Sequence, residues 1–250
     1  MQKRVLTNQY LLRLKLSLLL GSILVLLLGC GIGNGFTGGG VPIGRAVIIG
    51  QAVSATGPNT PIANALVYVS VSTNTRVIGT TLTTTTDSSG KFKFSDIPVE
   101  TAPTSIRVAV DPQSSSYVSQ QILFKLDKDK TANLIVTLAP YTLDLSSAST
   151  LILSPSNNFF ATNIAGKVNA QVLDSQGNTL QLTPSLLLIG DFSSIQANGT
   201  FTASQEQVGT VEAFWYNNLQ ASGTVSVQSN GDGSPPPPPS KKAGVAPALR

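Results

Sequence analysis

Short runs of β-branched, leucine and aromatic residues recur about every ten positions along residues 45–228, between clusters of Gly, Pro, Asn, Asp and Ser. Apolar and polar positions alternate within several runs: Val168, Ala170 and Val172 share one face of a strand, and so do Val225 and Val227. A period of two is typical of strands with one buried face, and no stretch keeps the period of an amphipathic helix. The pattern therefore predicts an all-β protein.

The runs form two series, each the size of one β-sandwich. The first predicts strands at 45–53, 65–72, 77–85, 91–94, 105–110, 117–126 and 132–138. The second predicts strands at 143–146, 151–153, 167–173, 181–189, 199–203, 210–216 and 221–228. About seven strands complete an immunoglobulin-sized unit. We therefore predict two tandem β-sandwiches, at 43–140 and 141–228, with little linker at Pro140-Tyr141.

Three further segments lack this pattern. Residues 1–29 begin with basic residues and continue as an uncharged, leucine-rich run at 16–28, which is typical of an export signal. At about 1.5 Å per residue, this run is short for an apolar bilayer core of roughly 30 Å. Residues 30–42 are rich in glycine and predict a flexible tether. Residues 229–250 contain consecutive prolines and predict a disordered tail, either a spacer or a ligand for an aromatic groove.

The net charge of the chain resides in its leader. The charged residues of the leader are Lys3, Arg4, Arg13 and Lys15. They account for the whole net charge of +4, so a chain without the leader is neutral and carries no electrostatic footprint for nucleic acid. The first predicted sandwich is mildly basic and the second acidic, with Lys167 as its only base. We expect this asymmetry to be a feature of an ordinary solvated surface, because salt screens it.

The leader ends in Leu27-Leu28-Gly29-Cys30, which resembles the lipobox of bacterial lipoproteins. The resemblance implies that the bond after Gly29 is cut and that Cys30 is acylated on sulfur and nitrogen. Several acyl chains give durable anchoring, where one chain is marginal. The alternative is a plain secretory signal or an uncleaved anchor with an incidental cysteine. A lipoprotein would hold everything after Cys30 in the bacterial cell envelope on the extracytoplasmic side, in the periplasm or at the cell surface.

The first predicted sandwich carries a set of spaced elements: Gly50, Pro61 to Val67, Thr86 to Phe94 and Ile97-Pro98. Asp87 and Gly90 suit a tight turn between two strands, and Phe92 and Phe94 alternate so that both rings face the core. These elements resemble the carboxypeptidase regulatory-like domain, a prealbumin-type β-sandwich. In metallocarboxypeptidases this module carries no catalytic residue, so the resemblance implies no peptidase activity.

The second predicted sandwich resembles bacterial Ig-like domains of group 2, which occur in surface adhesins of the invasin and intimin kind. The residues that carry the resemblance are Val168 to Gly177, Ile195 to Ala203, Gly209 to Ala213 and Ser222 to Val227. These modules generally act as rigid spacers or display units in extracellular proteins. The resemblance therefore implies adhesion or scaffolding by association.

The chain contains no histidine, and Cys30 is its only cysteine. This excludes Ser-His-Asp and Cys-His catalysis and any intramolecular disulfide. Asp191, Glu206 and Glu212 would have to converge to give carboxylate chemistry, and roles in turns and on the surface are favoured instead. Residues 127–130 alternate Asp and Lys without the pattern of a calcium loop, so we expect a solvated hairpin tip. We predict no catalytic residue, no metal site and no cofactor.

Aromatic residues gather at Phe214-Trp215-Tyr216, and Phe159-Phe160 stand in a stretch that reads as a loop. Neighbouring residues of a strand face opposite sides, so at least one aromatic side would lie outside a single core. Exposed aromatics could stack on sugars or dock a partner, which makes all three residues candidate ligand contacts. The favoured alternative is that Trp215 packs inside the sandwich and that Phe214 and Tyr216 cover a contact between domains.

These observations favour a non-catalytic, lipid-anchored cell-envelope protein that displays β-sandwiches for adhesion, scaffolding or envelope assembly. Its partners would be the membrane, through acyl chains on Cys30, and a protein or polysaccharide at the surface; no nucleic acid is expected. The alternative is a carbohydrate- or polymer-binding surface lipoprotein that captures substrate for separate machinery. An enzyme is the least favoured class, because its acid and base would have to be carboxylate, lysine or tyrosine alone.

Overall fold

The computed structural model describes residues 44–72, 80–154, 157–193 and 195–229. The predicted leader with Gly29 and Cys30, the tether and the proline-rich tail beyond Ser229 lie outside these residues. The described residues contain strands and one short 3-10 helix but no α-helix, which confirms the prediction of an all-β fold. They also contain no helix that is long and apolar enough to cross a membrane.

Seven strands belong to the first half of the chain: β1 (Gly44–Ser54), β2 (Leu66–Ser72), β3 (Thr80–Thr85), β4 (Lys91–Val99), β5 (Thr104–Asp111), β6 (Gln120–Leu126) and β7 (Thr131–Leu138). The second half contains the 3-10 helix η1 (Leu145–Ser147) and β8 (Thr150–Ser154), β9 (Asn157–Ala161), β10 (Gly166–Lys167), β11 (Asn169–Leu173), β12 (Ser185–Ile189), β13 (Thr200–Phe201), β14 (Gln207–Trp215) and β15 (Leu219–Gln228).

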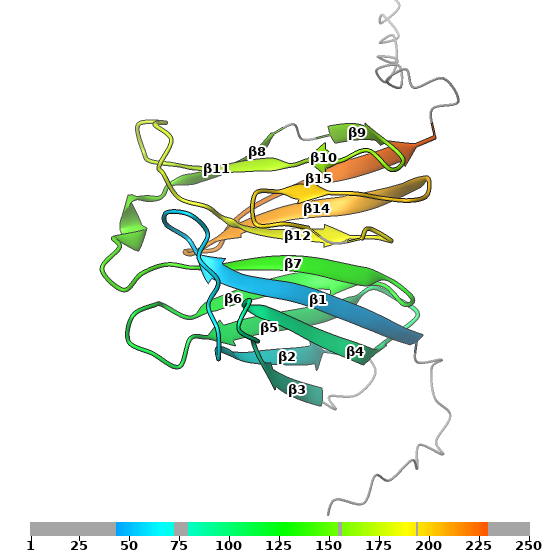
Figure 1. Cartoon of the computed structure of the whole chain (residues 1–250), viewed down its shortest axis with the longest axis horizontal. Helices are drawn as coiled ribbons and strands as arrows, with labels where there is room; N and C mark the ends of the chain where they lie inside the picture. Colours follow the sequence, from blue (N-terminus) through cyan, green and yellow to red (C-terminus); the bar gives the residue numbers. More distant parts are fainter. Residues whose placement is uncertain (1–43, 73–79, 155–156, 194, 230–250) are drawn as a thin grey trace, which may run out of the picture. The chain divides into compact units, whose positions relative to one another are not determined.

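The two halves share one continuous sheet. Its seven strands run in the order β4-β1-β7-β12-β14-β15-β9, so the first three strands come from the first half and the last four from the second (Figure 1). The junction is the antiparallel pairing of β7 with β12, in which Leu134 lies opposite Leu187 and Ile135 opposite Leu186. The sequence predicts two successive sandwiches, and the structure adds that backbone hydrogen bonds of one sheet run across them.

The remaining strands form three smaller sheets. A four-stranded sheet of the first half has the order β3-β2-β5-β6. In the second half, β8 pairs with β11 and β10 pairs with β13. The four-stranded sheet and the first-half part of the central sheet enclose one core, and the small sheets of the second half enclose another core with the rest of the central sheet.

The two cores lie on opposite faces of the central sheet and each takes residues from both halves. Leu134 and Leu187 belong to the first core, whereas their neighbours Ile135 and Leu186 belong to the second. Successive side chains of a strand point to opposite faces, so β7 and β12 contribute to both cores at once. All residues of β7 after Thr131 are buried. The junction strands therefore have no solvent-facing side.

A buried polar network also crosses the junction. Ser185 Oγ donates to Gln120 Oε1 at 2.8 Å and accepts from the backbone N–H of Thr137 at 2.9 Å. Its hydroxyl also lies 3.1 Å from Thr137 Oγ1. All three residues are buried, so each polar group needs these partners. The network joins β6, β7 and β12 and fixes the first half against the second.

Three predicted segments differ from the structure. Residues 143–146, predicted as a strand, lead into the helix η1, because the Asp144 carboxylate accepts from the backbone N–H of Ser146 at 2.9 Å and caps a turn. The stretch around Phe159-Phe160, predicted as a loop, forms β9, an edge strand parallel to β15. The predicted strand 167–173 is interrupted at Val168, whose N–H bonds to Gly199 O instead of a neighbouring strand.

The predicted turn of the first half and its two phenylalanines are confirmed. Asp87 Oδ1 accepts from the N–H groups of Ser89 at 2.8 Å and Lys91 at 2.9 Å, and Gly90 has a positive φ of 72°. Phe92 and Phe94 are both buried in the first core. Residues 127–130 are exposed as expected, but they connect β6 and β7, which lie in different sheets, so they are not the tip of a hairpin.

Candidate functional site

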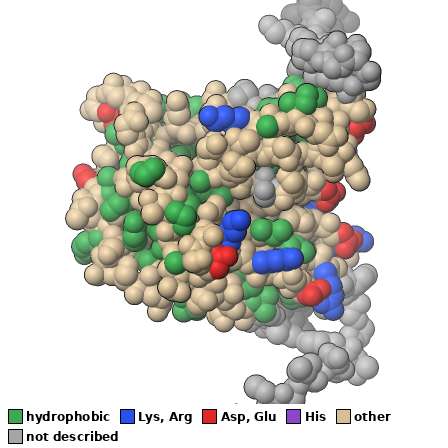
Figure 2. All heavy atoms as spheres, viewed as in Figure 1, with side chains coloured by type: hydrophobic (Ala, Val, Ile, Leu, Met, Phe, Trp, Pro, Cys, Tyr) green, Lys and Arg blue, Asp and Glu red, His purple; other side chains and the backbone are tan. Residues whose placement is uncertain are grey.

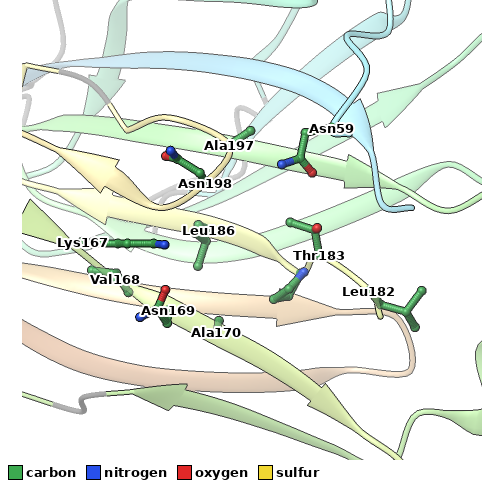
Figure 3. Close-up of a pocket in the computed structure, with 11 residues that line it drawn as sticks. Asn59, Lys167, Val168, Asn169, Ala170, Leu182, Thr183, Leu186, Ala197 and Asn198 are labelled. Atoms are coloured by element: carbon green, nitrogen blue, oxygen red, sulfur yellow. The ribbon is translucent and has the colours of Figure 1, made fainter. Parts of the chain in front are cut away.

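A pocket of about 240 Å³ opens where the loop after β1 meets the second half of the chain (Figure 3). Its polar lining residues come from four separate segments. They are Asn59, Lys167, Asn169, Thr183 and Asn198. Its apolar lining residues are Val168, Ala170, Leu182, Pro184, Leu186 and Ala197. The lining contains no acidic residue.

The loop that carries Asn59 is shaped by its own residues and tied to the second half. Asn59 has a φ of +47°, a left-handed conformation that asparagine tolerates better than most residues. The N–H of Ser54 bonds to Thr60 O at 2.8 Å, which closes the loop. The N–H of Thr183 bonds to Ala55 O at 2.9 Å and attaches the second half to it. The pocket therefore exists only because the two halves are held together.

The opposite wall is a tight turn against a short strand pair. Lys167 in β10 lies opposite Thr200 in β13, and the N–H of Val168 bonds to Gly199 O at 3.0 Å. Asn198 Oδ1 accepts from the N–H of Thr200 at 3.0 Å, which holds the turn. A Cβ on Gly199 would lie 2.0 Å from Val168 O, and its φ of +81° also favours glycine. The close approach places Lys167 and Asn198 on the same wall of the pocket.

Several polar groups at the pocket have no side-chain partner among the residues that the structure describes. Among the described residues, no side-chain hydrogen bond or ion pair involves the Lys167 ammonium or the Asn169 amide. Asn59 Oδ1 is buried and accepts no hydrogen bond from any described residue. In Figure 3, Lys167 and Asn169 lie at one end of the pocket, Asn59 and Thr183 at the other, and Leu186 between them. This arrangement can bind a small polar ligand.

On one face of the molecule, charged side chains are few and of both signs (Figure 2). Figure 2 shows a mostly uncharged face, on which basic and acidic side chains lie near each other in several places. Arg45 and Asp96 form such a pair at 3.1 Å, and both are largely exposed. An exposed pair of this kind contributes little to stability. Lys167 differs from Arg45 in lining a concave site without an acidic neighbour.

The structure places the aromatic candidates Phe214, Trp215 and Tyr216 inside the protein. Phe214 packs in the first core, and Trp215, 3% exposed, packs in the second. The Tyr216 ring stacks edge-on against Trp215 with centroids 5.3 Å apart. Because the sheet has a core on each face here, neighbouring residues can both be buried. These positions agree with the favoured interpretation of the sequence, in which Trp215 packs inside the sandwich and Phe214 and Tyr216 contact the other half.

Tyr216 bridges the two halves through its hydroxyl. The hydroxyl donates to Val118 O at 3.0 Å and accepts from the N–H of Ala139 at 3.0 Å. Burial raises the pKa of Tyr216 to about 12. In an unfolded chain tyrosine titrates near pH 10, about two units lower. Its proton therefore stabilises the folded state fully below pH 10, and this contribution is lost as the pH rises from 10 through 12.

Replacing Tyr216 with phenylalanine should lower the free energy of unfolding by about 1–2 kcal/mol at neutral pH, because two backbone groups lose their partner. The variant should also lose the part of the stability decrease between pH 10 and 12 that comes from Tyr216. Urea unfolding at pH 8 and pH 11, with Tyr68→Phe as the matched control, measures both effects. Equal pH dependence in wild type and Tyr216→Phe would contradict the assignment.

Glu206 and Glu212 engage separate partners through their carboxylates, and Asp191 is bonded through its backbone. Hydrogen bonds from the Ser229 side chain and backbone lower the pKa of Glu206, whereas burial raises the pKa of Glu212, which accepts from Gln220 Nε2 at 2.9 Å. The backbone N–H of Asp191 donates to Gln207 Oε1 at 2.7 Å. Across the described ranges, no three acidic or cysteine side chains gather as metal ligands would.

Sequence reasoning did not identify the pocket. It singled out Lys167 as the only base of 141–228 without assigning it a site, and it left Asn59 in a loop between predicted strands. The isolation of one cation among acidic residues was the available signal. Asn59 and Lys167 line the same pocket because of contacts between segments more than a hundred residues apart. No local sequence pattern predicts such contacts.

Comparisons with known proteins identify no family. No family model matches the chain, and no curated protein matches it. Among solved structures, an (S)-allantoin synthase is similar at 8% identity and a TM-score of 0.31, over 40% of this chain and 43% of that chain. Invasin, a bacterial integrin-binding protein, is similar at 17% identity and a TM-score of 0.23, over 76% of this chain and 40% of that chain. The chain thus spans less than half the length of either protein.

Proposed function

We propose that the protein is a lipid-anchored cell-envelope protein that displays its joined β-sandwiches for adhesion, scaffolding or envelope assembly. The observation that carries this proposal is Cys30, which directly follows an uncharged leucine-rich run and a basic N-terminal segment. A thiolate is the best nucleophile that the chain offers for acylation. Gly31 to Val41 then provide a glycine-rich spacer between the anchor and β1.

The folded part of the chain supports a display role through its rigidity. Adhesins and scaffolds must hold a binding surface in a fixed orientation, and a flexible hinge between modules would lose it. The β7–β12 pairing, the Ser185 network and the Tyr216 bridge all join the two halves. Along the chain, the proposed anchor precedes β1, which is the first strand of the joined halves.

The second candidate function is capture of a polysaccharide at the cell surface. Phe214 and Trp215 are buried, so the support for this function comes from the pocket at Lys167 and Asn59. Amide groups and an ammonium without protein partners suit a polar ligand better than an apolar one. This function is compatible with lipid anchoring, since a captured polymer would be held near the membrane.

Replacing Cys30 with alanine should abolish lipid modification. Wild-type protein purified from its native membrane should begin at Cys30 and carry the mass of a diacylglycerol and an acyl chain. The variant should lack all of this added mass, because alanine has no sulfur to acylate. Intact-mass spectrometry of both proteins measures the difference.

The control for this experiment is Ser22→Ala, which introduces the same residue into the apolar run and leaves the cysteine in place. It should be cut and acylated like the wild type. An intact leader or an unmodified N-terminus on the wild-type protein would contradict the proposal and would indicate a secreted or leader-anchored protein instead.

A further inference from the structure

The pocket at the junction of the two halves collects polar groups that the fold itself does not use. Asn59 Oδ1 is buried without a donor, and Lys167 and Asn169 have no side-chain partner among the described residues. Leaving a buried acceptor without a hydrogen bond costs about 1–3 kcal/mol. Because Asn59 Oδ1 has almost no accessible surface, a ligand in the pocket would bind Asn59 through its amide nitrogen, which has no partner among the described residues.

The charge of the pocket selects the kind of ligand. Lys167 is the only base of residues 141–228, and none of the described residues that line the pocket is acidic. Its ammonium therefore has no anionic partner in the site, although five acidic residues occur elsewhere in this half. A carboxylate on the ligand would complete an ion pair with Lys167. The open position of Lys167 at the rim would let such a group approach from solvent.

The remaining lining favours a sugar. Amide side chains both donate and accept hydrogen bonds, as hydroxyl groups do, and Asn59, Asn169 and Asn198 line the pocket. Leu186 lies between the two polar ends and, with Val168 and Ala170, provides apolar surface for the C–H groups of a ring (Figure 3). The volume of about 240 Å³ is below that of typical drug-binding pockets and is suited to a single sugar residue.

We propose that this pocket binds a uronic acid residue of a polysaccharide. Lys167 pairs with the carboxylate, and the side-chain amide groups of Asn59, Asn169 and Asn198 bind hydroxyl groups. The exposed rim at Lys167 and Asn198 leaves the neighbouring sugars of a polymer outside. This inference names the ligand of the second candidate function and does not depend on the lipid anchor, so the Cys30 experiment and this one fail independently.

The test is a ligand-observed NMR titration of the full chain in detergent micelles. The probes are D-galacturonate and D-glucuronate, with D-galactose and D-glucose as neutral counterparts. At least one uronate should bind more tightly than its neutral counterpart. Lys167→Met, which keeps the length of the side chain and removes its charge, should weaken uronate binding by about tenfold, the effect of losing a charged hydrogen bond.

Two further variants separate recognition from folding. Asn59→Gly removes the amide while tolerating the positive φ, and it should weaken binding of uronates and neutral sugars alike. Lys125→Met makes the same change as Lys167→Met at an exposed lysine of β6 and should leave binding unchanged. Matching thermal unfolding midpoints show that all three variants fold.

Three results would overturn the proposal. The first is equal affinity for the uronates and their neutral counterparts. The second is uronate binding that survives Lys167→Met. The third is tighter binding of the dipeptide Ala-Ala than of either uronate, which would show that the pocket recognises a peptide carboxylate.

Discussion

Replacing Ile106 with alanine should unfold both halves of the protein at a lower denaturant concentration. Ile106 in β5 is fully buried in the first core. Removing its side-chain carbons leaves a cavity in a close-packed interior, which typically costs about 2–5 kcal/mol. The fluorescence of Trp215 reports on the other half, because Trp215 is the only tryptophan of the chain and packs in the second core. We expect its fluorescence transition to shift as far as the overall circular dichroism signal.

The shared sheet is the reason for this coupling. Loss of the first core would expose Leu134 and Leu187, which face it from β7 and β12. It would also break the central sheet at the pairing of β7 with β12. The second half would then lose the neighbour that covers its junction strand. Two domains joined only by a linker would instead unfold separately.

Urea unfolding followed by both signals tests the prediction. The matched control is Ile152→Ala, because Ile152 is 41% exposed and its truncation should cost less than about 1 kcal/mol. A Trp215 transition that stays at the wild-type midpoint in Ile106→Ala would show that the halves unfold independently, in spite of the β7–β12 pairing.

Replacing Gly199 with alanine should be the most damaging single change near the pocket, lowering the free energy of unfolding by about 3–5 kcal/mol. Two costs add. The positive φ of +81° strains any residue with a Cβ, and the new methyl carbon would lie 2.0 Å from Val168 O. Because that oxygen belongs to the backbone, no change of side-chain rotamer can remove the clash. The β10 strand and the turn must therefore move apart. Lys167 would move with them.

Gly177→Ala is the matched control for Gly199→Ala. Gly177 has nearly the same conformation, with a φ of +84°, but nothing lies within 4 Å of an added Cβ. Gly177→Ala should therefore lower the free energy of unfolding only by the conformational cost, about 1 kcal/mol. The difference between the two variants in thermal or urea unfolding measures the close packing of the turn against Val168. Equal destabilisation would rule out that contact as a determinant of the pocket.

Local sequence patterns predict little of a candidate site that is formed by loops from separate segments. Lys167 stands out in the sequence by its charge alone, and Asn59 stands in a stretch of turn-forming residues. The two come together because Thr183 is bonded to Ala55 and β10 is held by the 198–200 turn. The surroundings of Trp215 are set in the same way, since the second core that buries it depends on strands far away in sequence.

Local patterns in the sequence predict most of the strands and the buried side of many of them. Alternation at Phe92 and Phe94 and turn chemistry at Asp87 and Gly90 act over a few residues, so a local pattern records them. The sequence also carried a hint of the junction: Leu186 to Leu188 form a continuous apolar run, as expected for a strand covered on both faces.

What covers those faces depends on packing between strands that lie far apart in the sequence. An apolar run can pair with any neighbour of matching length, and the choice of β7 as the partner of β12 rests on packing between residues about fifty positions apart. The same holds for β9, whose parallel pairing with β15 is made across more than sixty residues. Local propensities specify strands, whereas the order of strands in a sheet, and the pocket that this order creates, depend on the fit of the whole core.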